Sequence, residues 1–318
     1  MEDVYSRDLP FGTLVTAMVT PFTEEGSVDF DAVARLAETL VSEGCDGLVV
    51  SGTTGETSTL EDQEKEDLFR VVAETVGGRA KVIAGTGTNH TAHSVEMAVR
   101  AARAGADGQL VVTPYYNKPT QAGVLAHFDA VAAATDVPIM IYDIPGRSGI
   151  EIHTETMLKL AERPHILALK DAKADFSAVT RVMANTELDI YAGDDGLIFP
   201  WMMAGAVGVV SVVAHVATQQ FRALVDAASC GDLKTARRIH FELDPLVRAV
   251  MTHLPGAVSA KQILKMQGIL GNTAVRLPLV EPDAVEMEPV LTDLAEAGWD
   301  FSRPTRQYSA TTNTDESV

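Results

Sequence analysis

The chain of 318 residues is 46% hydrophobic, enough to bury one barrel-sized core or two smaller ones. Its formal net charge of −19 disfavours nonspecific binding to nucleic acid and to an anionic membrane surface. The two cysteines, Cys45 and Cys230, lie far apart with no Cys-x-x-Cys pair or His/Cys cluster, which argues against structural zinc and a disulfide framework.

The sequence shows no export signal and no membrane span. Residues 1–7 lack the basic segment followed by an apolar one that begins a signal peptide, and no run approaches 18 consecutive apolar residues. We therefore expect a cytoplasmic protein with no membrane and no nucleic acid among its partners.

Short β-branched runs alternate with helical periodicity as far as Gly231. Strands are predicted at residues 14–19, 47–51, 81–85, 108–113, 138–142, 166–170, 188–192 and 207–212. Helical stretches between them include residues 29–42, 60–76, 91–104 and 121–135. Because eight such units close a barrel, we expect an α/β fold of the TIM (β/α)8 type. An open dinucleotide-binding sheet is the rival, but GTGTNH at residues 85–90 falls short of Gly-x-Gly-x-x-Gly.

After Gly231 the alternation ends, and residues 233–250, 259–270 and 282–297 have helical periodicity with no strand between them. We therefore divide the chain into three parts. Residues 1–231 form the barrel, residues 232–301 a small all-helical C-terminal domain, and the polar residues 302–318 a tail that we expect to be mobile.

Unusual residues follow the predicted strands, at the end of the barrel where active sites form. After the second strand, SGTTGE at residues 51–56 places two threonines between glycines. Their N–H groups and hydroxyls are suited to an anionic ligand and to proton transfer, and the alternative is an ordinary turn before a helix.

The fourth and fifth strands end in TPYYN at residues 113–117 and YDIPGRSG at residues 142–149. A phenol near a reactive amine can relay protons, and the Arg147 guanidinium can grip a carboxylate. The alternatives are that Tyr115 or Tyr116 fills a subunit interface and that Arg147 pairs with an acidic neighbour.

The sixth predicted strand carries Lys170 at the end of the apolar run HILAL, residues 165–169. Burial disfavours an ammonium and lowers its pKa, which is a route to a nucleophilic amine that condenses with a carbonyl. The alternative is a lysine that reaches past the strand end to water. The seventh strand ends in GDD at residues 193–195, where an aspartate capping the next helix is favoured over a metal site.

Taken together, GTTGE at residues 52–56, Tyr142-x-x-Pro145-x-Arg147-x-Gly149 and Lys170 resemble the dihydrodipicolinate synthase family, within the pyruvate-dependent class I lyases. The resemblance runs from about residue 11 to residue 294 and is closest to actinobacterial members. Thr53 and Arg147 favour the synthases, because the sialic acid lyase branch typically reads GSTGE and resembles the chain less at Arg147.

The resemblance implies condensation of pyruvate with L-aspartate 4-semialdehyde to 4-hydroxy-tetrahydrodipicolinate, in the diaminopimelate route to lysine, without metal or organic cofactor. It implies that Lys170 forms the Schiff base with pyruvate and that Tyr142 gives and takes the proton there. By the same carry-over Thr53 relays protons to Tyr116, which in this family reaches in from a neighbouring subunit. A homotetramer built from two tight dimers is therefore expected.

Substrate-binding positions are also carried over from the resemblance. Thr53 and Thr54 would hold the pyruvate carboxylate, Arg147 the carboxylate of the semialdehyde, and the backbone carbonyl of Val210 would orient the bound keto acid. Gly193, after the seventh strand, is a further candidate in this group.

The chain departs from the family in two places. Lys173 and Ala174 stand where many members have Thr or Ser followed by Gly. At the positions of the allosteric lysine site, lysine-inhibited members often have histidines and a glutamate, whereas this chain has Asp62, Lys65 and His93. Asn89 and Tyr115 of that site are retained. We expect weak or absent inhibition by lysine.

Two further functions stay open at this stage. A related class I aldolase would use Lys170 in the same way on a sugar-derived 2-keto acid, such as sialic acid or a 2-keto-3-deoxy acid. A catalytically silent binding or regulatory barrel would not form the pyruvate adduct at all.

Overall fold

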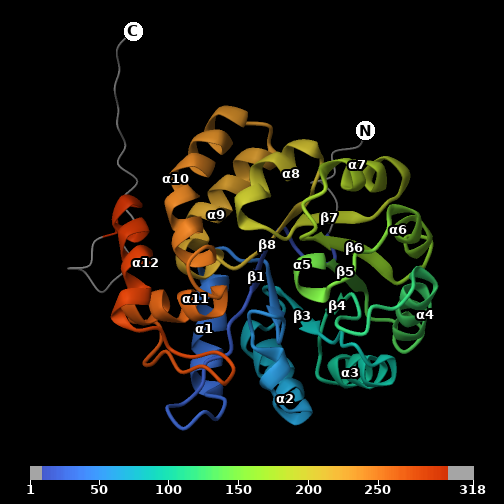
Figure 1. The fold of residues 1–318 in the computed structure, drawn as a ribbon, viewed down its shortest axis with the longest axis horizontal. Coiled ribbons are helices and arrows are strands. Elements are labelled where there is room, and N and C mark those ends of the chain that lie inside the picture. The colour runs from blue at the N-terminus through green and yellow to red at the C-terminus, as the bar shows by residue number, and fades with distance from the viewer. Residues whose placement is uncertain (1–8, 300–318) are drawn as a thin grey trace.

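Eight parallel strands close into a barrel in the computed structural model, which describes residues 9–299 (Figure 1). Each strand pairs with the next, and β8 returns to β1 with Val15 opposite Val210. The prediction of a (β/α)8 barrel is confirmed, with strand ends shifted by one or two residues. The strands are β1 (Leu14–Ala17), β2 (Gly47–Val50), β3 (Lys81–Gly85), β4 (Gly108–Val112), β5 (Ile139–Asp143), β6 (Ile166–Asp171), β7 (Asp189–Ala192) and β8 (Gly208–Ser211).

Helices cover the outside of the barrel, and polar side chains start several of them. Asp29 and Asp175 each accept a hydrogen bond from the backbone N–H three residues on, which satisfies a free donor of the first turn. The helices are α1 (Phe30–Ser42), α2 (Asp62–Val76), α3 (Thr91–Arg103), α4 (Gln121–Ala132), α5 (Pro145–Ser148), α6 (Thr154–Leu160), α7 (Phe176–Asn185), α8 (Ile198–Ala204) and α9 (Ala214–Ser229).

The predicted helix at residues 121–135 ends three residues early, at Ala132. Thr135 lies in the connection to β5, where its hydroxyl accepts hydrogen bonds from the N–H of Val137 (3.3 Å) and the amide of Gln109 (3.0 Å). A side chain that satisfies nearby donors in this way competes with the continuation of the helix.

The amino-terminal end of the barrel is filled by Phe11. Its ring lies edge-on to Tyr191, with 6.3 Å between ring centroids, and the Tyr191 hydroxyl donates to the carbonyl of Gly12 (2.7 Å). A methyl group at Gly108 would lie 2.5 Å from the Phe11 ring, so the strand must have glycine there. A ligand is therefore expected at the opposite end, where the strands finish.

The C-terminal helices α10 (Leu233–Met251), α11 (Gly256–Met266) and α12 (Ala284–Glu296) lie together at one side of the barrel (Figure 1). α10 packs against α9 and α12, and α11 also packs against α9. Residues 233–299 contain no strand, as predicted. α9 is part of the barrel's helical layer, so the C-terminal helices pack directly on the barrel, and the domain boundary at residue 231 stays a prediction. The predicted tail at residues 302–318 lies outside the described residues. No helix within residues 9–299 has the length and apolarity to cross a membrane.

Candidate active site

The loop after β2 brings two threonines to the mouth of the barrel. Two residues of this loop are left-handed, Ser51 (φ 58°) and Glu56 (φ 56°). The N–H of Glu56 donates to the Thr53 carbonyl (3.1 Å), and a methyl group on Gly55 would meet the Met18 carbonyl and the Ser51 backbone at 3.1 Å. The tight turn leaves the Thr53 side chain exposed and that of Thr54 half-buried.

Lys170 and Tyr142 lie opposite each other in the register of β5 and β6. Both side chains are 95% buried, and the Lys170 Nζ lies 4.2 Å from the centroid of the Tyr142 ring. Burial lowers the pKa of Lys170 to about 8, the negative charge of Asp195 opposes that shift, and the positive charge of Arg147 adds to it. The amine is therefore far more often neutral near physiological pH than an exposed lysine.

The Tyr142 phenol is protonated over the physiological range. Burial raises its pKa to about 12, while the Arg147 guanidinium and a hydrogen bond with the Thr53 side chain pull the pKa back down. A phenol that carries its proton next to a neutral amine can serve as a proton donor. The structure thus brings together Lys170, Tyr142 and Thr53, three residues that the sequence places on different strand ends.

A cavity of about 190 Å³ adjoins this group at Thr53, and Thr53, Thr54 and the exposed Arg147 of α5 line it, whereas Lys170 and Tyr142 do not. The cavity also has an apolar wall from the C-terminal helical region, which includes Met251 and Leu279. Two hydroxyls and a guanidinium around one small cavity suit a ligand with a carboxylate.

Gly193 and Val210 flank the same end of the barrel. The N–H of Gly193 donates to the Asp171 carbonyl (2.7 Å), and a methyl group at Gly193 would lie 3.0 Å from Cγ of Lys170. Glycine therefore keeps space beside the Lys170 stem. Val210 is buried in β8, so its backbone is fixed by pairing with β1.

Tyr116 does not line the cavity: its side chain is 88% exposed. The backbone of Tyr116 is left-handed (φ 72°), and its N–H donates to the Ser148 carbonyl (3.2 Å). A bulky residue held in a strained conformation and facing outward is typical of a binding surface. Its role as a proton relay remains a prediction.

Sequence reasoning missed Asp195 as a site residue. As predicted for this aspartate pair, Asp194 accepts a helix-capping hydrogen bond from the Gly196 N–H (3.0 Å). Asp195 instead holds the end of β8, because its buried carboxylate accepts from the Ser211 hydroxyl and from the Val212 N–H (3.1 Å). The spacing of 16 residues to Ser211 offers no local sequence signal for this contact.

His215, also missed, ties the same strand end to β1. Its Nε2 accepts from the Val19 N–H (2.9 Å), so Nδ1 carries the proton and donates to the Val212 carbonyl (2.7 Å). Burial lowers the pKa of His215 to about 4, which keeps this neutral tautomer in place at physiological pH.

Lys173 lies behind the site, near the outward-facing carboxyls of Asp143 and Asp171. Burial raises the pKa of Asp143 to about 7 and that of Asp171 to about 6, and the charge of Lys173 opposes both shifts. Its ammonium also lies 2.6 Å from the carboxylate of Glu151. Ala174 is left-handed (φ 61°). Lys173 thus offsets the negative charge of this cluster.

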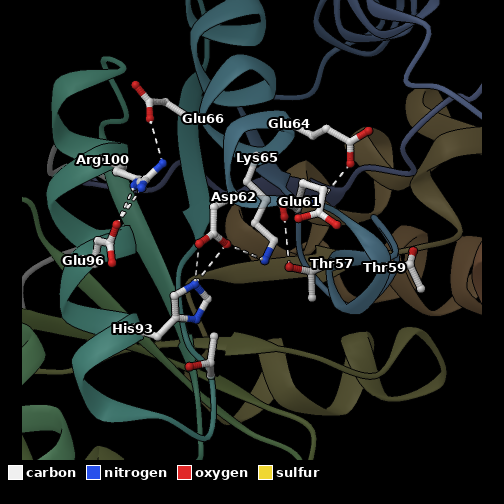
Figure 2. A network of polar contacts seen from close by, with 12 residues as sticks. Thr57, Thr59, Glu61, Asp62, Glu64, Lys65, Glu66, His93, Glu96 and Arg100 are labelled. Atoms are coloured by element: carbon white, nitrogen blue, oxygen red, sulfur yellow. Dashed lines mark hydrogen bonds and ion pairs between the residues drawn. The ribbon is translucent and has the colours of Figure 1, made fainter.

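Three positions of the expected lysine site, Asp62 and Lys65 of α2 and His93 of α3, form a network (Figure 2). Nε2 of His93 lies 2.9 Å from both carboxylate oxygens of Asp62, and Nζ of Lys65 lies 3.4 Å from one of them. Burial would raise the pKa of Asp62, but the hydrogen bonds and charges of His93 and Lys65 outweigh it and lower the pKa. Asn89 accepts a hydrogen bond at its carbonyl from the Asn117 side chain, and Tyr115 is 36% exposed.

Metal binding finds no support in the side chains. Within residues 9–299, no three His, Cys, Asp or Glu side chains gather closely enough to hold a metal ion.

Comparison with known proteins identifies close relatives. The model of the Dihydrodipicolinate synthetase family matches residues 10–297. A 4-hydroxy-tetrahydrodipicolinate synthase of Kineococcus radiotolerans is 53% identical over 91% of this chain and 94% of its own length.

Solved structures agree with the sequence comparison. A dihydrodipicolinate synthase of Aquifex aeolicus superposes with a TM-score of 0.88 and 37% identity, covering 93% of this chain and 100% of that one. The enzyme of Cyanidioschyzon merolae, solved with lysine bound, has a TM-score of 0.87 and 39% identity, covering 92% and 99%.

The raised pKa of Asp143 predicts a dependence of stability on pH. Between the pKa of about 3.9 of a free aspartate and about 7, the folded protein holds a proton on Asp143 that the unfolded chain has released. The protonated carboxyl therefore stabilises the folded state relative to higher pH, and this contribution to the free energy of unfolding is lost as the pH rises through 7. In Asp143→Asn the titration is removed, and the free energy of unfolding relative to wild type should increase by about 2 kcal/mol from pH 5 to pH 8.

Urea unfolding at several pH values measures this difference. The histidines are present in both proteins, so their contribution cancels when the two free energies of unfolding are subtracted. Asp31→Asn, on the exposed face of α1, is the control. Parallel pH profiles for Asp143→Asn and wild type would contradict the assignment of a raised pKa to Asp143.

Proposed function

The chain belongs to the dihydrodipicolinate synthetase family, and from this premise we propose how its residues condense pyruvate with L-aspartate 4-semialdehyde. The product is 4-hydroxy-tetrahydrodipicolinate, in the diaminopimelate route to lysine. The observation that carries the residue assignment is the buried Lys170 amine, whose pKa is lowered to about 8 beside a protonated phenol.

Lys170 is the nucleophile in this proposal. Its neutral amine adds to the ketone carbon of pyruvate, and loss of water gives a protonated imine. The imine withdraws electrons, so a methyl proton of the bound pyruvate can pass to the Tyr142 phenol, which has given its own proton to the leaving water, and an enamine forms. The enamine carbon attacks the aldehyde of the semialdehyde, and the aldehyde oxygen takes that proton to become a hydroxyl. The amino group of that substrate then displaces Lys170 and closes the ring.

Proton transfers are assigned to Tyr142, Thr53 and Tyr116. Tyr142 gives a proton to the oxygen that leaves as water and takes one back during ring closure, because its phenol lies against Lys170. Thr53, hydrogen-bonded to Tyr142, passes the proton on. Tyr116 completes the relay from a partner subunit, a role supported by its exposed side chain.

The substrate carboxylates are assigned to the cavity lined by Thr53, Thr54 and Arg147. Thr53 and Thr54 hold the carboxylate of pyruvate, and Arg147 that of the semialdehyde. The Val210 carbonyl orients the keto acid, and Gly193 leaves room for it next to the Lys170 side chain.

A relay through Tyr116 requires a second subunit, so we assign the protein to a homotetramer made of two tight dimers. The same proposal places it in the cytoplasm, where the rest of an amino-acid biosynthetic route operates. It also keeps the barrel and the C-terminal helices as two domains divided near residue 231.

Inhibition by lysine is proposed to be weak or absent. The Asp62 carboxylate already contacts His93 and Lys65, so the ammonium of a lysine ligand would have to displace contacts that the chain itself makes. Asn89 and Tyr115, the retained positions, do not remove this competition.

Arg147 separates the synthase from an aldolase acting on a sugar-derived 2-keto acid. Loss of a carboxylate contact to arginine costs about 2 to 3 kcal/mol, so Arg147→Ala should raise KM for the semialdehyde by about 30- to 150-fold. KM for pyruvate should change little. Arg181→Ala, which removes an exposed pair with Glu155 on the outer helices, is the matched control.

The same preparations are treated with pyruvate and borohydride, and the modified peptide is found by mass. An adduct on Lys170 and turnover with the semialdehyde are expected. Turnover of sugar-derived keto acids with no effect of Arg147→Ala would favour the aldolase. Absence of any adduct would favour the catalytically silent barrel. An adduct on another lysine would contradict the mechanism.

Lysine sensitivity is checked by titrating the condensation rate with lysine. Because the partners of Asp62 belong to the chain, less than half of the activity should be lost at millimolar lysine. Lys65→Ala/His93→Glu should increase sensitivity by freeing Asp62. Potassium chloride at equal ionic strength is the control, since salt screens exposed ion pairs. Half-inhibition of the wild type at low-millimolar lysine or below would refute this proposal.

A further inference from the structure

An ion pair buried at the side of the barrel joins the Thr53 loop to the C-terminal helices. Nζ of Lys261, on α11, lies 2.5 Å from the carboxylate of Glu56, and both side chains are at least 98% buried. The ammonium also donates to the Ala274 carbonyl (2.8 Å), and the second carboxylate oxygen of Glu56 accepts from the Arg276 N–H (2.9 Å). The two ends of this contact are 205 residues apart in sequence.

Arg276 and Phe22 complete the surroundings of the pair. The Arg276 guanidinium makes a bidentate contact with Glu64, at 2.6 and 2.7 Å, and donates to the carbonyls of Thr59 and Gly26. The Lys261 ammonium and the Arg276 guanidinium lie 4.3 Å and 4.5 Å from the Phe22 ring centroid. The segment after α11 is therefore tied to both sides of the loop that carries Thr53.

Stability alone does not account for a charged pair at this position. Taking two charges out of water costs about as much as their attraction returns, so apolar residues of equal volume would hold the domains together as well. A pair of this kind does fix the relative positions of the segments that it joins, because its hydrogen bonds have fixed lengths and directions.

The segment that the Lys261–Glu56 pair positions is the turn that carries Thr53 and Thr54. Glu56 is left-handed, a conformation that costs a non-glycine residue about 1 kcal/mol. Its N–H closes the turn onto the Thr53 carbonyl, and the Thr53 side chain is hydrogen-bonded to Tyr142. A continuous set of contacts thus runs from Lys261 through Glu56 and Thr53 to Tyr142, whose ring lies against Lys170.

We propose that Lys261, together with the Arg276 N–H, is a positioning residue for catalysis: it holds Glu56 so that Thr53 and Thr54 meet the substrate and Tyr142 in the correct orientation. The inference rests on the proposed function, because it assigns those threonines to the reaction. It gives the C-terminal helical region a part in the chemistry of the barrel, although none of its residues reacts.

The test compares two variants with the wild-type enzyme. Lys261→Met/Glu56→Gln removes both charges while keeping the side-chain volumes and one acceptor for the Arg276 N–H. Glu56→Gln alone leaves the buried Lys261 ammonium without its counter-charge, so it is the more disruptive of the two variants. Lys265→Met, an exposed lysine four residues further along α11, is the matched control. For each protein the melting temperature, kcat, the two KM values and the extent of borohydride trapping of pyruvate on Lys170 are measured.

The double variant is expected to melt within a few degrees of wild type and to trap pyruvate fully at saturating concentration. Its kcat should fall by at least tenfold and its KM for pyruvate should rise several-fold. Glu56→Gln should show changes at least as large, together with a lower melting temperature, because it leaves Lys261 unpaired. Lys265→Met should show none. A purely structural role would lower the melting temperature and the amount of folded enzyme, not kcat per trapped site.

Two results would overturn the inference: a kcat per trapped site within twofold of wild type in the double variant, or, if that variant does not fold, an unchanged kcat in Glu56→Gln. Failure of the wild type to trap pyruvate on Lys170 would instead contradict the proposed function, so the two failures are distinguishable.

Discussion

The ammonium form of Lys170 is costly because its side chain is buried at the end of β6, among the inward-facing residues of the barrel. Burial, aided by the charge of Arg147 and opposed by that of Asp195, lowers the pKa of Lys170 to about 8. The same burial raises the pKa of Tyr142 to about 12. One physical constraint, removal of polar groups from water, thus prepares an amine to attack and a phenol to donate.

The rest of the barrel keeps this arrangement in place. Phe11 fills the opposite end, so the strand ends that carry Lys170 and Tyr142 are where a ligand can enter. Buried polar groups then fix the loops around them: Asp195 holds the end of β8, and Glu56 is held by Lys261 of the C-terminal helices. A close-packed interior alone would not orient the exposed Thr53 hydroxyl; directed hydrogen bonds do.

The fold was predictable from the sequence because its signals are local. β-branched runs and helical periodicity give the positions of all the strands, and residues after strand ends lie together in any barrel, which is why Lys170, Tyr142 and Thr53 could be grouped. The early end of α4 at Ala132 was missed because Thr135 is used by partners on other elements. Contacts between distant segments, such as Glu56 with Lys261 and Asp195 with Ser211, leave no periodic pattern in the sequence and were not predicted. Lys261, which stands among apolar residues of α11, was the one local signal of its contact with Glu56.

The pKa of Lys170 is the quantity on which the account depends most directly. Competitive trace acetylation over a range of pH, with the Lys170 peptide quantified by mass and Nα-acetyl-lysine as internal standard, measures it in the folded enzyme. We predict that the reactivity of Lys170 rises with an inflection near pH 8. An inflection near that of a free lysine side chain, about 10.4, would show that burial does not activate this amine and would contradict the account.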